Sequence, residues 1–266
     1  MTESGRTPPK TIDIGALEDQ ATALLHEAVR HLEAGIAQAT DEETRGRLRQ
    51  RQFRLLRRLD PAGLWASQAG QDRWLEENVF RGKRNGVFAE VGAFDGISGS
   101  NTWFFETFRA WCGLLIEPSP HWAATCRSHR DVPCIQAAAG GEVRSARFLE
   151  VERGYTQMGG LVESYDQGLM DRVKQDPRYE GREIEVAVRP LGDMLIEHGL
   201  TRVDYLSLDV EGAEIEVLRA FPFDRIAVTA WSVENHGDKP EIAAIMAQAG
   251  YVRARRIGED DIWVLL

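Results

Sequence analysis

Two acids and two glycines gather where the first strongly apolar run of the chain ends. The run at residues 87–91 leads into the segment EVGAFDG, which holds Glu90, Gly92, Asp95 and Gly96. In an open α/β sheet, ligands bind beyond the carboxyl ends of the strands, and glycine lets a ligand approach the backbone closely. The spacing differs from G-x-G-x-x-G, which disfavours a dinucleotide. A carboxylate here suits the ammonium group of an amino acid, although an ordinary strand-to-helix turn would use the same residues.

A second apolar run ends in the same manner. Residues 113–117 close on Glu117, and Pro118 follows directly. An acid at the end of a second strand has two oxygens, which can accept hydrogen bonds from the two hydroxyl groups of a ribose. The alternative interpretation of Glu117 is an acid in a surface turn.

Small residues follow the third apolar run, which covers residues 132–136. Ala137 and Ala138 come directly after it. Side chains of this size would let a flat ring such as adenine lie against the backbone. Together with the first two strand ends, these residues favour a nucleoside as the ligand of the predicted crevice.

Five polar residues in the C-terminal third form a further group. Asp209 ends an apolar run, where an unpaired carboxylate is costly to desolvate, so it must lie at the crevice mouth, pair with a donor or bind a cation. Glu211 follows two positions later, and Glu234, Asn235 and His236 end the next apolar run. Carboxylate and amide oxygens suit Mg²⁺ or Mn²⁺ rather than zinc. His236 has a simpler alternative role, which is to cap a loop.

The elements that must position these residues alternate regularly after residue 86. Short β-rich runs and helical stretches take turns, which predicts a mostly parallel sheet covered by helices on both faces. The predicted strands cover residues 87–91, 113–117, 132–136, 147–151, 183–188, 205–209 and 226–234. The predicted helices cover 99–110, 119–130, 190–198, 213–220 and 240–248, and a β-hairpin of 252–256 and 262–266 closes the sheet.

An N-terminal extension precedes this pattern. Apolar residues spaced by three or four predict a helix over 14–39, and the segment TDEE at 40–43 indicates a capping box that opens a second helix, which ends before Pro61. Seven arginines lie between Arg45 and Arg58. We interpret them as a solvated or partner-facing surface rather than a nucleic-acid site. The positions predicted to face inward on the second helix are Leu48, Leu55, Leu56 and Leu59.

The chain is therefore expected to consist of an extension, 1–66, and an α/β domain, 67–266. Within the domain, residues 153–182 are rich in glycine, tyrosine and methionine and lack strand periodicity. An insertion of this kind often forms a lid or a substrate cap. The apolar stripe of the extension predicts a protein contact, for which a second copy of the chain is one candidate.

Length and composition exclude several classes of protein. With 266 residues, of which 43% are hydrophobic and 28% charged, the chain is globular rather than collagen-like or disordered. A net charge of −10 disfavours nucleic-acid binding. No apolar run reaches the roughly 18 residues of a membrane span. The N-terminus has no leader-like apolar region and the three cysteines lack zinc or disulfide spacing, so we expect a cytoplasmic protein.

Five segments in this order resemble the FkbM family of S-adenosylmethionine-dependent methyltransferases. Each segment alone is only modestly specific, but the ordered set is strongly so, and the resemblance covers roughly residues 68–266. The five segments lie at 67–72, 90–96, 100–102, 113–118 and 209–214.

The resemblance implies a class I methyltransferase fold, which is a Rossmann-like seven-stranded sheet with helices on both faces and an antiparallel last strand. It implies that Glu90, Gly92 and Asp95 surround the methionine part of S-adenosylmethionine, and that Glu117 holds the ribose. The residues predicted to bind the cofactor are Glu90, Gly92, Asp95, Gly96, Asn101, Glu117, Pro118, Ala137, Ala138 and Asp209.

The resemblance also implies a reaction. Members of the family methylate hydroxyl groups of sugars, polyketides and other natural products, and the similar macrocin-type enzymes use a divalent cation. By similarity Asp209, Glu234 and Asn235 would bind Mg²⁺ or Mn²⁺, with Glu211 as the base. Asn235 stands where an acid is expected. The predicted catalytic residues are Asp209, Glu211 and His236, and the predicted reaction is O-methylation of a small hydroxylated molecule.

Two alternatives belong to other functional classes. One is an NAD-linked oxidoreductase on a doubly wound sheet, which the glycine spacing and the acid at Glu90 disfavour. The other is a catalytically silent adaptor that recruits a partner through its N-terminal helices. The acids retained at the strand ends argue against such a silent site.

Overall fold

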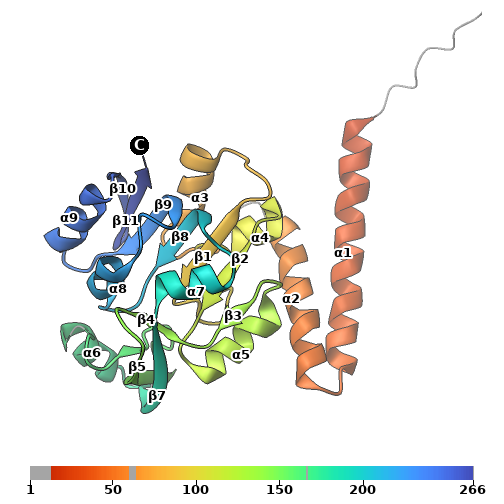
Figure 1. The fold of residues 1–266 in the computed structure, drawn as a ribbon. Coiled ribbons are helices and arrows are strands. Elements are labelled where there is room, and N and C mark those ends of the chain that lie inside the picture. The colour runs from red at the N-terminus through yellow and green to blue at the C-terminus, as the bar shows by residue number, and fades with distance from the viewer. Residues whose placement is uncertain (1–12, 60–63, 166, 266) are drawn as a thin grey trace, which may run out of the picture. The chain divides into compact units, whose positions relative to one another are not determined.

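The computed structural model describes residues 13–59, 64–165 and 167–265 (Figure 1). The chain divides into two compact units, Met1–Leu64 and Trp65–Leu266. Each unit is described by itself. No helix among the described residues has the length and apolar character needed to cross a bilayer.

The N-terminal unit is a helical hairpin of α1 (Ile14–Gln38) and α2 (Glu42–Leu59). Side-chain caps begin both helices: Asp13 accepts the Ala16 amide at 3.0 Å, and Asp41 accepts the Thr44 amide at 2.7 Å. Such caps satisfy backbone donors that have no partner within the helix. The predicted capping segment therefore does open the second helix, with Asp41 as the capping residue.

The two helices contact each other through polar and apolar groups. Gln52 Nε2 donates to Glu33 Oε1 at 3.3 Å, and the Gly35 backbone lies against Leu48. Leu56, which we expected to face inward, is 46% exposed, because a two-helix hairpin buries only the narrow stripe where its helices meet. Leu17 and Leu24 of α1 are also exposed.

The second unit contains a seven-stranded sheet in the order β10-β11-β9-β8-β1-β2-β3. All pairings are parallel except those of β11 with β9 and with β10, which are antiparallel. This sheet confirms the predicted fold class, including the closing hairpin. The strands are β1 (Val87–Val91), β2 (Cys112–Ile116), β3 (Cys134–Ile135), β8 (Arg202–Leu208), β9 (Ala227–Glu234), β10 (Tyr251–Ile257) and β11 (Asp260–Leu265).

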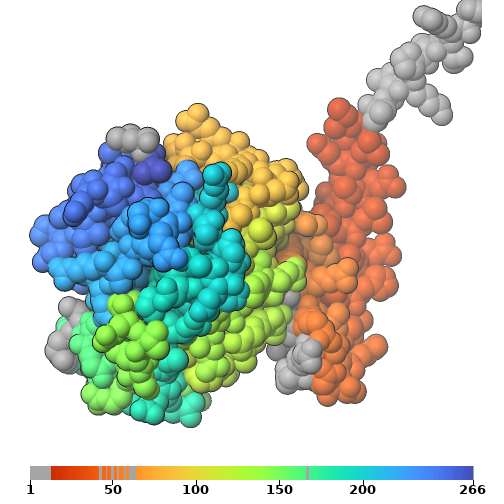
Figure 2. Space-filling view, in the orientation of Figure 1, coloured from red at the N-terminus to blue at the C-terminus, as the bar shows by residue number. Residues whose placement is uncertain are grey.

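Helices cover both faces of this sheet, as the alternation predicted. One face packs Ala89 and Val91 against apolar side chains of α7, α8 and α9, and α7 and α8 hide much of this face in the space-filling view (Figure 2). On the other face, Tyr205 of β8 contacts Phe80 and Phe105. The helices are α3 (Gln71–Leu75), the π-helical turn η2 (Glu76–Phe80), α4 (Trp103–Arg109), α5 (Pro120–His129), α7 (Leu191–Glu197), α8 (Glu214–Ala220) and α9 (Pro240–Gln248).

A second sheet corrects part of the strand prediction. The runs at 147–151 and 183–188 were expected in the parallel sheet, but they lie in long strands that pair with each other in antiparallel register. Residue periodicity reports which side of a strand is buried and carries no information on its partner or direction. The sheet has the order β4-β7-β5-β6. Its elements are β4 (Ala138–Gly140), β5 (Arg144–Arg153), β6 (Gly160–Leu161), α6 (Gln167–Lys174) and β7 (Glu180–Pro190).

Two predicted elements are shorter in the structure. The third strand covers only Cys134–Ile135, after which the chain crosses into the second sheet. The helix expected over 99–110 begins at Trp103, because residues 100–102 instead bond the Glu90 carboxylate. The predicted insertion, 153–182, contains β6 and α6, and its role as a lid stays a prediction.

Candidate active site

Two adjoining cavities lie beyond the carboxyl ends of β1, β2 and β8. The larger has a volume of about 540 Å³ and the smaller about 60 Å³. The two cavities are neighbours, because seven residues belong to the linings of both. Residues common to both linings are Val91, Gly92, Phe94, Thr156, Gln157, Asp209 and Glu211.

The loop after β1 comes unusually close to the end of β8. Gly92 has a φ of 83°, and a Cβ at this position would lie 2.0 Å from the Asp209 carbonyl oxygen. Only glycine fits such an approach. Phe94 also has a positive φ, 49°, which is uncommon for a bulky residue and marks a backbone held by its surroundings.

The Glu90 carboxylate is buried at the end of β1 and holds the following loop. Its Oε2 accepts hydrogen bonds from Ser100 Oγ at 2.8 Å and Thr102 Oγ1 at 2.6 Å, and its Oε1 accepts the Asn101 amide at 2.7 Å. Because a carboxylate oxygen accepts two hydrogen bonds, Oε1 has room for another donor in the larger cavity, which Glu90 lines. Beside it, Asn101 Oδ1 is buried with no partner among the described residues.

Glu117 lies in the smaller cavity directly after β2. Its Oε2 accepts the Phe94 amide at 2.8 Å and its Oε1 accepts the Ser119 amide at 2.9 Å, so each oxygen keeps one acceptor position. Burial raises the pKa of Glu117 to about 7, and the negative charge of Glu150 on β5 adds to the shift. Glu150 also lines this cavity, which the sequence did not indicate.

The rest of the smaller cavity is largely apolar. Ala137 and Ala138 line it together with Pro118, and the rings of Phe94 and Trp122 lie with their centroids 4.1 Å apart at its edge. A narrow apolar slot beside a carboxylate fits a flat ring attached to a hydroxylated one.

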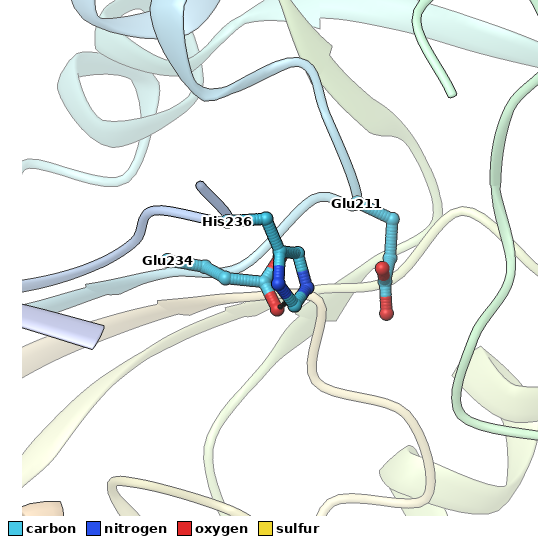
Figure 3. Close-up of side chains that lie close together, drawn as sticks. All are labelled: Glu211, Glu234 and His236. Carbon is cyan, nitrogen blue, oxygen red and sulfur yellow. Dashed lines mark ion pairs between the residues drawn. The ribbon is translucent and has the colours of Figure 1, made fainter. Parts of the chain in front are cut away.

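The larger cavity contains a cluster of two acids and a histidine (Figure 3). Glu211, Glu234 and His236 each offer a ligand atom, and these atoms lie within 4.8 Å of one another. His236 Nε2 is 2.8 Å from Glu234 Oε1, with which it forms an ion pair when protonated. The Oε2 atoms of Glu211 and Glu234 are buried and have no hydrogen-bond partner among the described residues. Buried polar atoms are normally hydrogen-bonded, and an ordered water, a ligand donor or a cation can supply the partner of these oxygens.

Burial, together with repulsion between neighbouring carboxylates, disfavours the ionised forms of these acids. Burial raises the pKa of Glu211 to about 9, and repulsion from Asp209 contributes. Burial also raises the pKa of Glu234 to about 9, and repulsion from Glu211 contributes. Burial, followed by repulsion from Glu234, raises the pKa of Asp209 well above its ordinary value. A positively charged ligand would lower these pKa values and release protons.

The cluster should make the unliganded protein less stable as the pH rises. Folded Glu234 holds its proton up to a pH of about 9, whereas the unfolded chain releases it near its ordinary value, so stability is lost as the pH rises through this window. We expect the Glu234→Gln variant to melt about 5 °C above the parent at pH 9 and at the same temperature at pH 4.5. Thermal melts in a chelating buffer measure this, with Glu241→Gln as a surface control. A difference in melting temperature between variant and parent that is the same at pH 4.5 and pH 9 would contradict this expectation.

Three predicted site residues lie outside the linings of both cavities, and their expected roles stay predictions. Asp95 Oδ1 accepts the Ile97 and Ser98 amides and shapes the loop. Gly96 is required because a Cβ there would meet the Arg130 side chain at 2.8 Å. Asn235 is buried. Its Nδ2 donates to Asp261 at 2.8 Å, and its Oδ1 accepts the Lys239 amide at 2.7 Å, so the amide oxygen already bonds the backbone of the following loop.

Sequence reasoning missed other residues of the larger cavity. Gln71 donates to Asp260 at 2.9 Å, and Asp260 lies opposite Glu234 in the pairing of β11 with β9. Both residues line the cavity. Gln71 belongs to a motif segment, which was a usable signal, but Asp260 reaches the site only through the antiparallel register of the last strand.

Comparison with known proteins shows the family of the chain. A family model described as the Methyltransferase FkbM domain matches residues 90–253. The chain belongs to the FkbM methyltransferase family. The methyltransferase sdnD of Sordaria araneosa is similar to this FkbM-family chain, with 32% identity over 104 residues. That match covers 33% of this chain and 39% of the relative, so the chain spans about two fifths of the relative's length.

Two solved structures have a weaker similarity to this FkbM-family chain. Methyltransferase FkbM from Methylobacillus flagellatus KT is 12% identical with a TM-score of 0.44, covering 91% of this chain and 60% of that one. Precorrin-6y C5,15-methyltransferase from Geobacter metallireducens GS-15 is 11% identical with a TM-score of 0.36, covering 72% of this chain and 85% of that one.

Proposed function

We propose that this methyltransferase uses S-adenosylmethionine to methylate a hydroxyl group of a small molecule, such as a sugar, a polyketide or another natural product. The observation that carries the proposal is that the largely apolar cavity beside Glu117 adjoins the larger cavity, and that Gly92, Asp209 and Glu211 line both. An elongated cofactor in both cavities would bring its reactive centre next to a base.

The free acceptor positions match the polar groups of such a cofactor. Ribose hydroxyls can donate to the two Glu117 oxygens, and adenine fits between Ala137, Ala138 and the aromatic edge at Trp122. In the larger cavity, Glu90 Oε1 and Asn101 Oδ1 can accept from an ammonium group.

In the proposed mechanism, Glu211 removes the proton of the acceptor hydroxyl. S-adenosylmethionine, when bound, supplies a methyl group on a positively charged sulfur, which leaves as a neutral thioether. That positive charge favours the ionised form of Glu211 before transfer, and Glu211 holds the hydroxyl proton afterwards. His236, paired with Glu234, lies where it can orient the acceptor oxygen.

A divalent cation would fit the cluster of Glu211, Glu234 and His236. Two buried carboxylate oxygens without partners are the donors that Mg²⁺ or Mn²⁺ prefers, and Mn²⁺ also accepts an imidazole nitrogen. When bound, the ion would lower the pKa of the acceptor hydroxyl. Asp209 lies next to this set, whereas Asn235 is engaged elsewhere.

The metal part of the proposal predicts a thermal shift. A few millimolar MnCl₂ should raise the melting temperature of the parent protein by about 5 °C, because a ligand that binds only the folded state stabilises it. The Glu234→Gln variant should show no shift, and a chelator should slow methyl transfer. An unchanged rate in the presence of the chelator would contradict the metal proposal and would leave the proposed methyl transfer unaffected.

The function is tested with purified protein and S-adenosylmethionine carrying an isotope-labelled methyl group, incubated with a library of hydroxylated acceptors. We expect labelled ethers and equimolar S-adenosylhomocysteine. Failure to bind S-adenosylhomocysteine would favour the adaptor alternative, and a change in nicotinamide absorbance would favour the oxidoreductase.

We also propose that the exposed apolar side chains of the N-terminal unit contact a second copy of the chain, which sedimentation equilibrium would reveal as a dimer.

A further inference from the structure

The buried guanidinium of Arg130 forms hydrogen bonds to several residues of the loop between β1 and α4. Arg130 follows α5, and its side chain has no exposed surface. Its donors reach several points of the loop that are distant from it in sequence. Nη1 donates to the Gly96 carbonyl at 2.8 Å and Ser100 Oγ at 3.2 Å and lies 3.5 Å from Glu90 Oε2, and Nη2 donates to Thr102 Oγ1 at 3.0 Å.

The guanidinium is itself held from the other side. Its Nε donates to Glu106 Oε2 at 2.5 Å, while Glu106 Oε1 accepts the Asp131 amide at 2.8 Å. The guanidinium carbon also lies 5.4 Å from the centre of the Phe88 ring in β1. A planar guanidinium whose three nitrogens all donate has a fixed orientation, so Arg130 is a rigid support for the loop.

What this loop presents to the larger cavity depends on that support. Glu90 Oε1 fixes the Asn101 amide, and Asn101 Nδ2 donates to Ser207 Oγ at 2.9 Å, which leaves Asn101 Oδ1 unpartnered among the described residues of the cavity. Arg130 holds the residues on both sides of Asn101. The same loop is fixed at its other end by the bond from the Phe94 amide to Glu117, which belongs to the nucleoside slot.

We propose that Arg130 is a positioning residue that shapes the site for the amino-acid end of the cofactor and leaves the nucleoside end to Glu117. The inference rests on the proposed use of S-adenosylmethionine. Arg130 has no place in the lining of either cavity, so it acts through Glu90 and Asn101. Since the two ends of the loop have separate anchors, loss of one anchor should weaken the binding of only one part of the ligand.

The test compares two ligands that differ only in the amino-acid end. S-adenosylhomocysteine has that end, and 5′-methylthioadenosine lacks it. For Arg130→Lys, which keeps the charge but loses the planar fork, we expect the Kd for S-adenosylhomocysteine to rise about tenfold or more. The Kd for 5′-methylthioadenosine should stay within about twofold. Thr102→Val removes one hydroxyl of the network at similar volume. It should also raise the Kd for S-adenosylhomocysteine relative to the Kd for 5′-methylthioadenosine.

The control is Arg127→Lys in the last turn of α5, where the guanidinium donates to the Cys134 carbonyl instead of the loop. This variant should bind both ligands as the parent does. Equal weakening of both ligands in Arg130→Lys and Thr102→Val would overturn the inference, because it would mean a general loosening of the fold. Unchanged binding of S-adenosylhomocysteine in both would overturn it too. If the parent binds neither ligand, the proposed function fails and the inference falls with it.

Discussion

The Glu211→Gln variant should transfer methyl groups about 10³-fold more slowly than the parent, while its Kd for S-adenosylhomocysteine changes less than about threefold. Glutamine keeps the volume of the side chain and the positive φ of 55° at this position. It cannot take up the hydroxyl proton. Because Glu211 Oε2 has no hydrogen-bond partner among the described residues, the substitution breaks no bond in that part of the structure.

A single-turnover assay with labelled methyl groups measures this rate without the contribution of product release. Glu241→Gln on the surface of α9 serves as a matched control and should keep the parental rate. A Glu211→Gln rate within tenfold of the parent would assign the base to another group, for which His236 is the next candidate. A parallel loss of cofactor affinity would indicate a binding role instead.

The Glu117→Gln variant should bind S-adenosylhomocysteine about 100-fold more weakly. An amide nitrogen would face one of the two backbone donors, Phe94 or Ser119, that now point at the carboxylate. The ribose would also lose a charged acceptor. Unlike Arg130→Lys, this substitution should weaken the binding of 5′-methylthioadenosine by the same factor, because both ligands carry the ribose.

Binding should also depend on pH through the same group. The ribose donates to ionised Glu117, whose pKa is about 7 in the free protein, so affinity should fall up to tenfold per pH unit below 7 and level off above it. Isothermal titration from pH 5.5 to 8.5 measures this dependence. Glu150→Gln removes a neighbouring negative charge and should move the inflection to lower pH. A Kd independent of pH would contradict the ribose contact.

The parts of the site that follow from local patterns could be predicted from the sequence. An apolar run that ends in an acid predicts a strand with a carboxylate at its carboxyl end, and the parallel sheet then brings such ends to one edge. Glu90, Glu117 and Asp209 all line the paired cavities for this reason. Ala137 and Ala138 line the slot because the chain leaves the third strand there.

The parts that depend on distant pairing could not be predicted. Glu150 reaches the slot only because β5 belongs to a second sheet, and no local pattern sets that pairing. Arg130 lies in a polar stretch, and its importance depends on acceptors that come together only in the folded chain. Asn235 follows a strand end like the other candidates, yet Lys239 and Asp261 hold its side chain outside both cavities.

A crystal structure of the protein with S-adenosylhomocysteine tests the central claim most directly. We predict that the ribose hydroxyls contact Glu117, that the adenine lies between Ala138 and Trp122, and that the sulfur faces the cavity of Glu211. Electron density for the ligand on another surface, or with the amino-acid end in the slot beside Glu117, would contradict it.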